Sequence, residues 1–186
     1  MIQRDLYLQK IIDYMWDGQI KVITGIRRAG KSTLLFDLFY DYLLKKSVKA
    51  ENIIKLQLDK RKDSKYRNPI VLAEYVENQV SKSKEKFYLL IDEIQFCYSV
   101  PDPDNEGYEI TVYDMLNELK DYKNLDVYVT GSNSKMLSKD ISTEFRGRSS
   151  QIHVYPLSFS EFHATKGGDK RDNFDSYMIY GGLPYL

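Results

Sequence analysis

The motif GIRRAGKS, between Gly25 and Ser32, has the residue types and spacing that cradle a phosphate group. It matches the pattern GxxxxGK[ST], in which glycines let the loop curl until backbone N–H groups converge on an anion. Lys31 adds a positive charge for the β- and γ-phosphates, and the Ser32 hydroxyl is a ligand for Mg²⁺. A glycine-rich turn that holds no nucleotide is the alternative. The expected strand before the loop and helix after it favour a nucleotide site.

Two adjacent carboxylates, Asp92 and Glu93, end the apolar run KFYLLIDE. Magnesium is held by few protein oxygens, so it needs a carboxylate that faces the phosphates. Asp92 is the predicted metal ligand, and Glu93 is predicted to orient and polarise an attacking water. Such a pair also occurs at ordinary solvated strand ends, but the phosphate loop earlier in the chain favours the catalytic interpretation.

Two further polar segments could complete such a site. The run TGSN at 130–133 follows a predicted strand, and Asn133 or Ser132 could position the water. Small polar residues also terminate strands and cap helices, so this role has a structural alternative. Arg146 and Arg148 precede the last predicted strand. An arginine there could neutralise transition-state charge across a subunit boundary, or lie in a solvated turn.

The elements that must position these residues alternate between strand and helix patterns. Short apolar runs predict five strands, which lie at 20–24, 52–59, 86–93, 125–130 and 151–155. Helical spacing predicts helices at 8–16, 32–46, 69–80 and 111–120, another after Asn133, and shorter ones at 158–163 and 173–180. Segments 60–67 and 98–109 are predicted polar loops. The alternation predicts an α/β fold with a mainly parallel sheet.

Composition limits the class of protein. The chain has 186 residues, of which 42% are hydrophobic and 29% charged, enough for one packed domain and unlike a disordered chain. Its 27 basic and 27 acidic residues cancel, so no net field draws it to nucleic acid or a membrane. Its one cysteine, Cys97, is predicted to be a small packing residue. The lack of a disulfide, zinc spacing, leader or membrane span predicts a cytoplasmic protein.

Two charged segments suggest partners but lack a supporting motif. Between positions 45 and 67 there are nine basic and three acidic side chains, which could touch DNA phosphates, yet no helix-turn-helix or zinc module accompanies them. The acidic segment 98–109 fails as a calcium loop, because the twelfth position from Asp102 is Tyr113. We expect both segments to be solvated surface.

The motifs together resemble one family. GIRRAGKST, LLIDEIQ, TGSNS, FRGR and YPLSFSEF followed by GGLP are similar to the prokaryotic AAA+ ATPases that carry a C-terminal domain of unknown function. The double arginine in the phosphate loop and the PLSF-x-EF segment make the resemblance specific, and it spans essentially the whole chain. It implies a P-loop NTPase three-layer sandwich, with helices on both faces of a five-stranded sheet in the order 5-1-4-3-2.

The resemblance also implies site residues and domain limits. Asp92 and Glu93 match the Walker B pair, Asn133 the sensor, and Arg146 and Arg148 the arginine region. Residues 1–156 are then the nucleotide domain, and 157–186 begin a C-terminal region that continues beyond this sequence in family members. The implied nucleotide-binding residues are Gly25, Arg27, Arg28, Ala29, Gly30, Lys31, Ser32 and Thr33.

The predicted function is Mg²⁺-dependent ATP binding and hydrolysis that drives a conformational change. Partners are ATP or ADP, a second copy of the chain, and a protein or DNA through the C-terminal region. One alternative is a non-enzymatic nucleotide switch or DNA-associated adaptor. Another is a small-molecule phosphotransferase, although the carboxylate pair favours water activation. A GTPase is disfavoured because the chain has no Asn-Lys-x-Asp motif.

Overall fold

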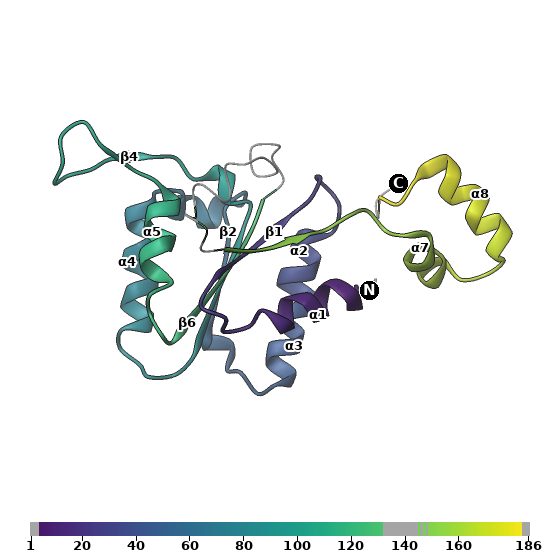
Figure 1. The fold of residues 1–186 in the computed structure, drawn as a ribbon, viewed down its shortest axis with the longest axis horizontal. Coiled ribbons are helices and arrows are strands. Elements are labelled where there is room, and N and C mark those ends of the chain that lie inside the picture. Colours follow the sequence, from purple (N-terminus) through teal and green to yellow (C-terminus); the bar gives the residue numbers. More distant parts are fainter. Residues whose placement is uncertain (1–3, 132–144, 146, 148, 184–186) are drawn as a thin grey trace.

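Five parallel strands form the central sheet of the computed structural model, which describes residues 4–131, 145, 147 and 149–183 (Figure 1). Their spatial order is β2-β3-β6-β1-β7. Numbered along the chain as five strands, this is the order 5-1-4-3-2, so the predicted fold class is confirmed. The strands are β1 (Ile20–Thr24), β2 (Ile53–Gln57), β3 (Phe87–Asp92), β6 (Leu125–Thr130) and β7 (Ser149–His153).

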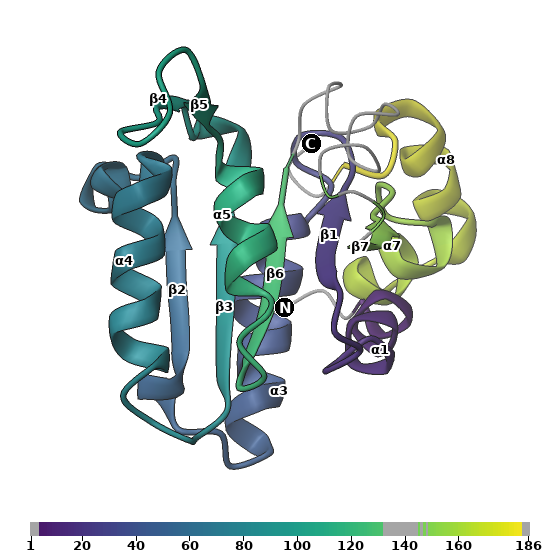
Figure 2. The ribbon, with the colours of Figure 1, turned by 60° about the vertical axis from the view of Figure 1, so that its left-hand side comes forward.

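Helices cover both faces of this sheet (Figure 2). Helices α4 (Pro69–Val80) and α5 (Val112–Leu119) lie on one face. Helix α1 (Asp5–Asp13) and a continuous helical stretch over 31–45 lie on the other. Two more helices, α7 (Phe159–Lys166) and α8 (Lys170–Tyr180), stand beside the sheet beyond β7. No helix in these described parts is long and apolar enough to cross a membrane.

Alternate strand residues build two separate apolar clusters. Val22 and Leu89 pack toward α4 and α5, whereas their neighbours Ile23 and Leu90 pack toward α1 and the helical stretch over 31–45. All four side chains are fully buried. A strand with helices on both sides needs apolar residues at consecutive positions, which explains the unbroken apolar runs in the sequence.

The starts of two helices follow their capping residues. Asn68 accepts a hydrogen bond from the Ile70 N–H at 3.0 Å, and Pro69 opens α4. Thr111 and Asp114 form a reciprocal capping box at α5. The predicted helix start at position 69 is therefore confirmed, and the helix predicted from 111 begins one residue later, with Thr111 as its cap.

The helix after the phosphate loop differs from its prediction in one respect. It begins as α2 (Lys31–Thr33), widens to a π-helical stretch over Leu34–Phe39, and ends as α3 (Tyr40–Lys45). The wider turn buries three consecutive residues from Leu34 to Phe36. Leu38, four residues after Leu34, is only partly buried.

The segment 60–67 is a 3₁₀-helix over Arg61–Arg67 rather than the predicted polar loop. Asp63 accepts a hydrogen bond from the Gln57 N–H at 2.8 Å, and Arg67 Nε donates to the Leu58 carbonyl at 2.7 Å. These contacts tie the segment to the end of β2. The charge pattern of segment 60–67 cannot predict these hydrogen bonds, because they depend on the tertiary position of the segment beside β2.

The predicted surface loop 98–109 contains a small antiparallel pair, β4 (Val100–Pro101) and β5 (Glu109–Ile110). The pair protrudes at the end of the molecule opposite α8 (Figure 1). Cys97 lies at its base and is half-buried, and burial raises the pKa of its thiol to about 12. A thiol with such a pKa stays protonated at neutral pH, consistent with the predicted packing role.

Candidate phosphate-binding site

The loop between β1 and α2 begins at a position that only glycine can occupy. Gly25 has φ of 144°, and a Cβ atom there would lie 2.2 Å from the carbonyl oxygen of Val154. The chain after β7 thus passes directly against the loop. Gly30 immediately precedes α2 and has the left-handed conformation, with φ of 91°. The two glycines of the motif therefore set the curvature of the loop.

Lys31 is folded into the loop rather than extended into solvent. Its side chain is only 4% exposed, and its Nζ donates to the carbonyl oxygens of Gly25 at 3.0 Å and Ile26 at 2.9 Å. Burial lowers the pKa of Lys31, and the charges of Glu93 and Asp92 oppose that shift. Among the described residues, no carboxylate lies close enough to form an ion pair with it.

The end of β3 brings a carboxylate to the start of α2. Asp92 is 3% exposed, and its carboxylate accepts a hydrogen bond from the Thr130 hydroxyl. Burial raises the pKa of Asp92, the hydroxyls of Thr130 and Ser32 oppose this, and the charge of Glu93 adds to it. The predicted metal ligands Ser32 and Asp92 therefore lie near each other.

These two oxygens suit magnesium. A hydroxyl and one carboxylate are hard donors, and Mg²⁺ usually takes only one or two carboxylates from a protein, with phosphates and water as its other ligands. In the described parts of the chain, no group of three or more His, Cys, Asp or Glu side chains could hold a metal ion alone. Ser32 and Asp92 thus fit a metal that arrives with a phosphate, rather than a structural metal centre.

Glu93 leaves the strand in an unusual conformation. Its φ is 56°, in the left-handed region, and its N–H donates to the Thr130 hydroxyl at 3.1 Å. The Gln95 amide donates to the Glu93 carboxylate. The turn separates Glu93 from Asp92, so the two adjacent carboxylates have different surroundings and can have different roles.

The structure brings together one part of the predicted site. Residues Gly25 to Thr33 form one loop and the first turn of a helix, beside Asp92 and Glu93. Arg27 and Arg28 are exposed within this loop. The predicted sensor residues Ser132 and Asn133 and the predicted arginines Arg146 and Arg148 lie outside the described residues.

Sequence reasoning missed two polar side chains. Thr130 was predicted only as part of a polar segment in which Ser132 or Asn133 would act, yet its own hydroxyl joins Asp92 to the backbone of Glu93. The pairing of β3 with β6, together with the strand ends, could have indicated this contact. Arg4 donates from Nη1 to the Ala29 carbonyl at 3.0 Å, and no motif marks it.

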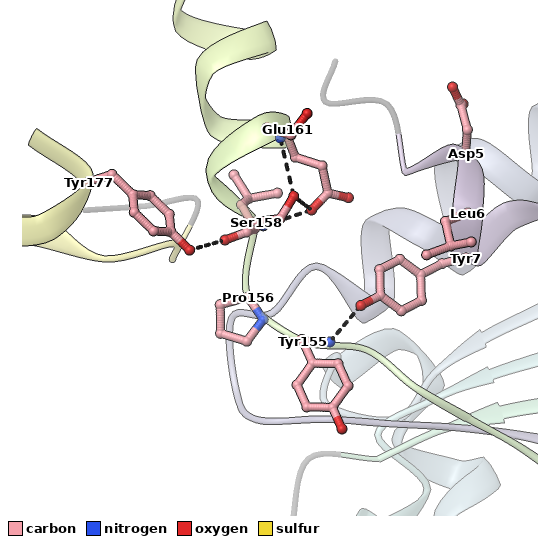
Figure 3. Close-up of a pocket in the computed structure, with 10 residues that line it drawn as sticks. Asp5, Leu6, Tyr7, Tyr155, Pro156, Ser158, Glu161 and Tyr177 are labelled. Atoms are coloured by element: carbon pink, nitrogen blue, oxygen red, sulfur yellow. Dashed lines mark hydrogen bonds between the residues drawn. The ribbon is translucent and has the colours of Figure 1, made fainter. Parts of the chain in front are cut away.

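A cavity of about 690 Å³ lies between the start of α1 and the start of α7 (Figure 3). Tyr7 and Tyr155 both line it, and the Tyr7 hydroxyl accepts a hydrogen bond from the Tyr155 N–H at 3.3 Å. Arg4, next to the cavity, bonds both to the phosphate loop and, at 2.8 Å, to the Tyr155 carbonyl. The cavity and the loop are therefore neighbours.

Comparison with known proteins identifies the family. A family model described as an AAA domain matches residues 17–163. An uncharacterized protein of Haemophilus influenzae is 36% identical over 99% of this chain and 44% of its own length. An uncharacterized protein of Methanocaldococcus jannaschii is 32% identical over 100% of this chain and 36% of its own length. The chain spans less than half the length of both relatives.

Solved structures share the fold. A Walker-type ATPase of Pyrococcus abyssi has a TM-score of 0.63 at 14% identity, covering 99% of this chain and 65% of that one. AMPPCP-bound DnaA from Aquifex aeolicus has a TM-score of 0.58 at 13% identity, covering 95% and 55%. The Aeropyrum pernix Orc1 protein in complex with DNA has a TM-score of 0.57 at 11% identity, covering 96% and 50%.

The family match covers most of the sequence and includes the phosphate loop, both strands that flank β1, and the Asp92–Glu93 pair. The strand order agrees with it, as do the solved structures. The chain therefore belongs to the AAA domain family, and its fold is that of the AAA+ P-loop ATPases.

Proposed function

We propose that this chain is the nucleotide-binding module of an ATPase that binds ATP with Mg²⁺, hydrolyses it, and changes its contacts with attached or partner domains according to nucleotide state. The observation that carries the proposal is the environment of Lys31. Its ammonium group is buried in a glycine-bounded loop, bonded to two carbonyls, and close to the Asp92 and Glu93 charges. A buried cation that forms no ion pair with a carboxylate favours an anionic ligand as its partner.

The roles of the side chains follow from their positions. Lys31 would contact the β- and γ-phosphates, and Ser32 and Asp92 would hold Mg²⁺, which when bound neutralises charge on those phosphates. Glu93 would orient and polarise the water that attacks the γ-phosphorus, giving ADP and phosphate. Asn133 is proposed to position the same water.

We propose that the remaining part of the nucleotide lies in the cavity between α1 and α7. Its volume of about 690 Å³ is ample for a nucleoside. Tyr7, Tyr155 and Pro156 give it apolar walls that suit a base, and Arg4 connects it to the phosphate loop. The adenine identity of the base is part of the proposal.

We also propose how this chain is organised within a longer protein. We propose that residues 1–156 are the nucleotide domain and that α7 and α8 lead from it into a C-terminal region. Assembly with further copies would let Arg146 or Arg148 neutralise charge at a neighbouring site. A cytoplasmic location and a protein or DNA partner for the C-terminal region complete this proposal.

The test compares this chain and a C-terminally extended form, each as wild type and as Glu93→Gln. Calorimetry with ATP and Mg²⁺ measures binding, and phosphate release measures turnover. We expect all four proteins to bind MgATP, and Glu93→Gln to lower turnover by about 100-fold or more, because it removes the group that acts on water. A wild-type chain that does not bind MgATP would contradict the proposal.

A second candidate is a nucleotide switch that acts on DNA without turnover. It is favoured by the fold shared with the Orc1 protein in complex with DNA. Salt-dependent DNA binding by the extended form, with MgATP binding but no phosphate release, would support it. ADP release that requires a small-molecule acceptor would instead indicate a phosphotransferase.

A further inference from the structure

Arg4 contacts three separate segments of the chain, two through hydrogen bonds and one through an ion pair. Its guanidinium is 4% exposed and lies just before α1. Nη1 donates to the Ala29 carbonyl at 3.0 Å, Nη2 donates to the Tyr155 carbonyl at 2.8 Å, and Nε lies 2.9 Å from Glu161 Oε1. One planar cation thus joins the phosphate loop, the chain after β7, and α7.

The contact with Ala29 fixes a peptide group inside the phosphate loop. Because a trans peptide is planar, its carbonyl and its N–H point in opposite directions. The Ala29 carbonyl points toward Arg4, so the Gly30 N–H is turned away from Arg4. The Ala29 side chain is fully buried, which leaves this peptide little freedom to rotate. Arg4 therefore sets the direction of one of the N–H groups available to a phosphate.

The contact with Glu161 involves the residue that caps the start of α7, and Figure 3 shows that cap. Glu161 Oε2 accepts hydrogen bonds from the N–H of Ser158 at 2.8 Å and from its hydroxyl at 3.0 Å, which closes the capping box of that helix. The other oxygen, Oε1, pairs with Arg4. A single carboxylate therefore caps α7 and attaches it to the guanidinium that holds the phosphate loop.

We propose that Arg4 is a positioning residue that sets the phosphate loop for nucleotide and transmits occupancy of the loop to α7 through Glu161. The inference rests on the proposed function, because it assigns a regulatory path to the same nucleotide site. Only a guanidinium suits the position: its donors lie in one plane and point in several directions, whereas a lysine ammonium is a compact point charge. Nucleotide that orders the loop then also orders the first turn of α7.

The test separates the two ends of this path. Arg4→Lys keeps the charge and removes the planar donors. Glu161→Gln removes the ion pair and keeps a residue that can still close a capping box. Arg171→Lys, at an exposed position in α8, is the matched control. The measurements are calorimetric affinity for MgATP, amide hydrogen exchange at 159–162 with and without MgATP, and the thermal midpoint.

In the wild type and the control, MgATP is expected to slow exchange at 159–162 by about tenfold. Arg4→Lys is expected to weaken MgATP binding by about tenfold, because a charge-assisted hydrogen bond to the loop is lost. Glu161→Gln is expected to bind MgATP within about threefold of wild type but to lose the ATP-dependent slowing at 159–162. A purely structural role would change the thermal midpoint and leave that slowing in place.

Each contrary result has its own meaning. A wild type that fails to bind MgATP contradicts the proposed function, and the inference fails with it. If the wild type binds MgATP, equal binding by a folded Arg4→Lys contradicts the inference alone. If Arg4→Lys does not fold, Glu161→Gln decides, because ATP-dependent slowing that persists in it shows that α7 is not coupled through the ion pair.

Discussion

Lys21 and Lys31 lie toward opposite ends of β1, and both are almost completely buried, at 0% and 4% exposure. Their charges are treated differently. Lys21 Nζ lies 2.5 Å from Asp126 Oδ1 and 2.7 Å from Asp17 Oδ1. Lys31 Nζ is bonded to two backbone carbonyls of its own loop. Lys21 forms ion pairs with two carboxylates of the fold, whereas Lys31 is bonded to carbonyl dipoles and has the Asp92 and Glu93 charges only nearby.

Under the proposed function, the difference separates a structural cation from a phosphate-binding one. Asp126 is itself fixed, since its Oδ2 accepts hydrogen bonds from the Tyr128 hydroxyl at 2.6 Å and the Trp16 N–H at 3.0 Å. The charge of Lys21 is therefore fully used within the protein. Carbonyl dipoles orient the ammonium of Lys31 without cancelling its charge, so this lysine still attracts an anion.

The largest expected effect comes from breaking the Lys21 pair. Lys21→Met leaves the Asp126 carboxylate buried without its cation, and we expect it to lower the free energy of unfolding by about 3–5 kcal/mol. Urea unfolding followed by circular dichroism measures this. Lys82→Met, at an exposed lysine, is the matched control and should change stability by no more than about 0.5 kcal/mol. A similar small change in Lys21→Met would show that its pair is not structural.

The next effect is on ligand affinity rather than stability. Lys31→Met is expected to weaken MgATP binding by about 100-fold, or about 2.7 kcal/mol, because the cation that faces the phosphates is lost. The free energy of unfolding should change by about 1 kcal/mol or less, since no buried carboxylate loses a partner. Calorimetry and urea unfolding of the same sample give both numbers. Destabilisation equal to that of Lys21→Met would remove the distinction between the two lysines.

The fold could be predicted from the sequence because its signals are local. The strand at 20–24 ends at Gly25, the helix at 69 starts with a proline after a capping asparagine, and the buried strands appear as apolar runs. The strand order came from the family resemblance. The 3₁₀-helix over 61–67 could not be predicted, because the backbone of β2 and the side chain of Asp63 stabilise it.

The sequence predicts only those residues of the candidate site that belong to a known motif. Gly25, Lys31 and Asp92 stand in motifs whose chemistry is known, so their proximity followed from the parallel sheet. Arg4 acts through a planar guanidinium that reaches residues 25 and 151 positions away in the chain. No spacing rule connects such positions, because the contact depends on where α1 packs beside β7.

Asp92, at the end of β3, should make the binding of Mg²⁺ with ATP sensitive to pH. Burial raises the Asp92 pKa, so the folded state holds this proton at a pH where the unfolded chain has released it. Stability then falls as pH rises through that window, while Mg²⁺ binding, which needs the carboxylate, increases. We expect the Mg²⁺-dependent part of ATP affinity to decrease on acidification, beginning above the ordinary aspartate range of about 4.

Calorimetry between pH 5 and 8, with and without Mg²⁺, measures this dependence. Asp92→Asn should remove it and should leave the free energy of unfolding at neutral pH equal to or higher than that of wild type. Asp104→Asn, at an exposed carboxylate in the β4–β5 hairpin, is the control and should keep the wild-type profile. A wild-type profile in Asp92→Asn would exclude this carboxylate from the metal site.

The smallest expected effect concerns the Thr130 hydroxyl, which joins Asp92 to the Glu93 backbone. Thr130→Val keeps the shape of the side chain but leaves the Glu93 N–H without this acceptor and Asp92 without one donor. We expect a loss of about 1 kcal/mol in unfolding free energy and a shift of the Mg²⁺-dependent pH profile to higher pH, since a hydrogen bond that favours the carboxylate is lost. Thr130→Ser keeps the hydroxyl and should restore both properties. If the valine variant has the wild-type pH profile, the Thr130 hydroxyl at the end of β6 does not affect the charge of Asp92, and burial alone sets that charge.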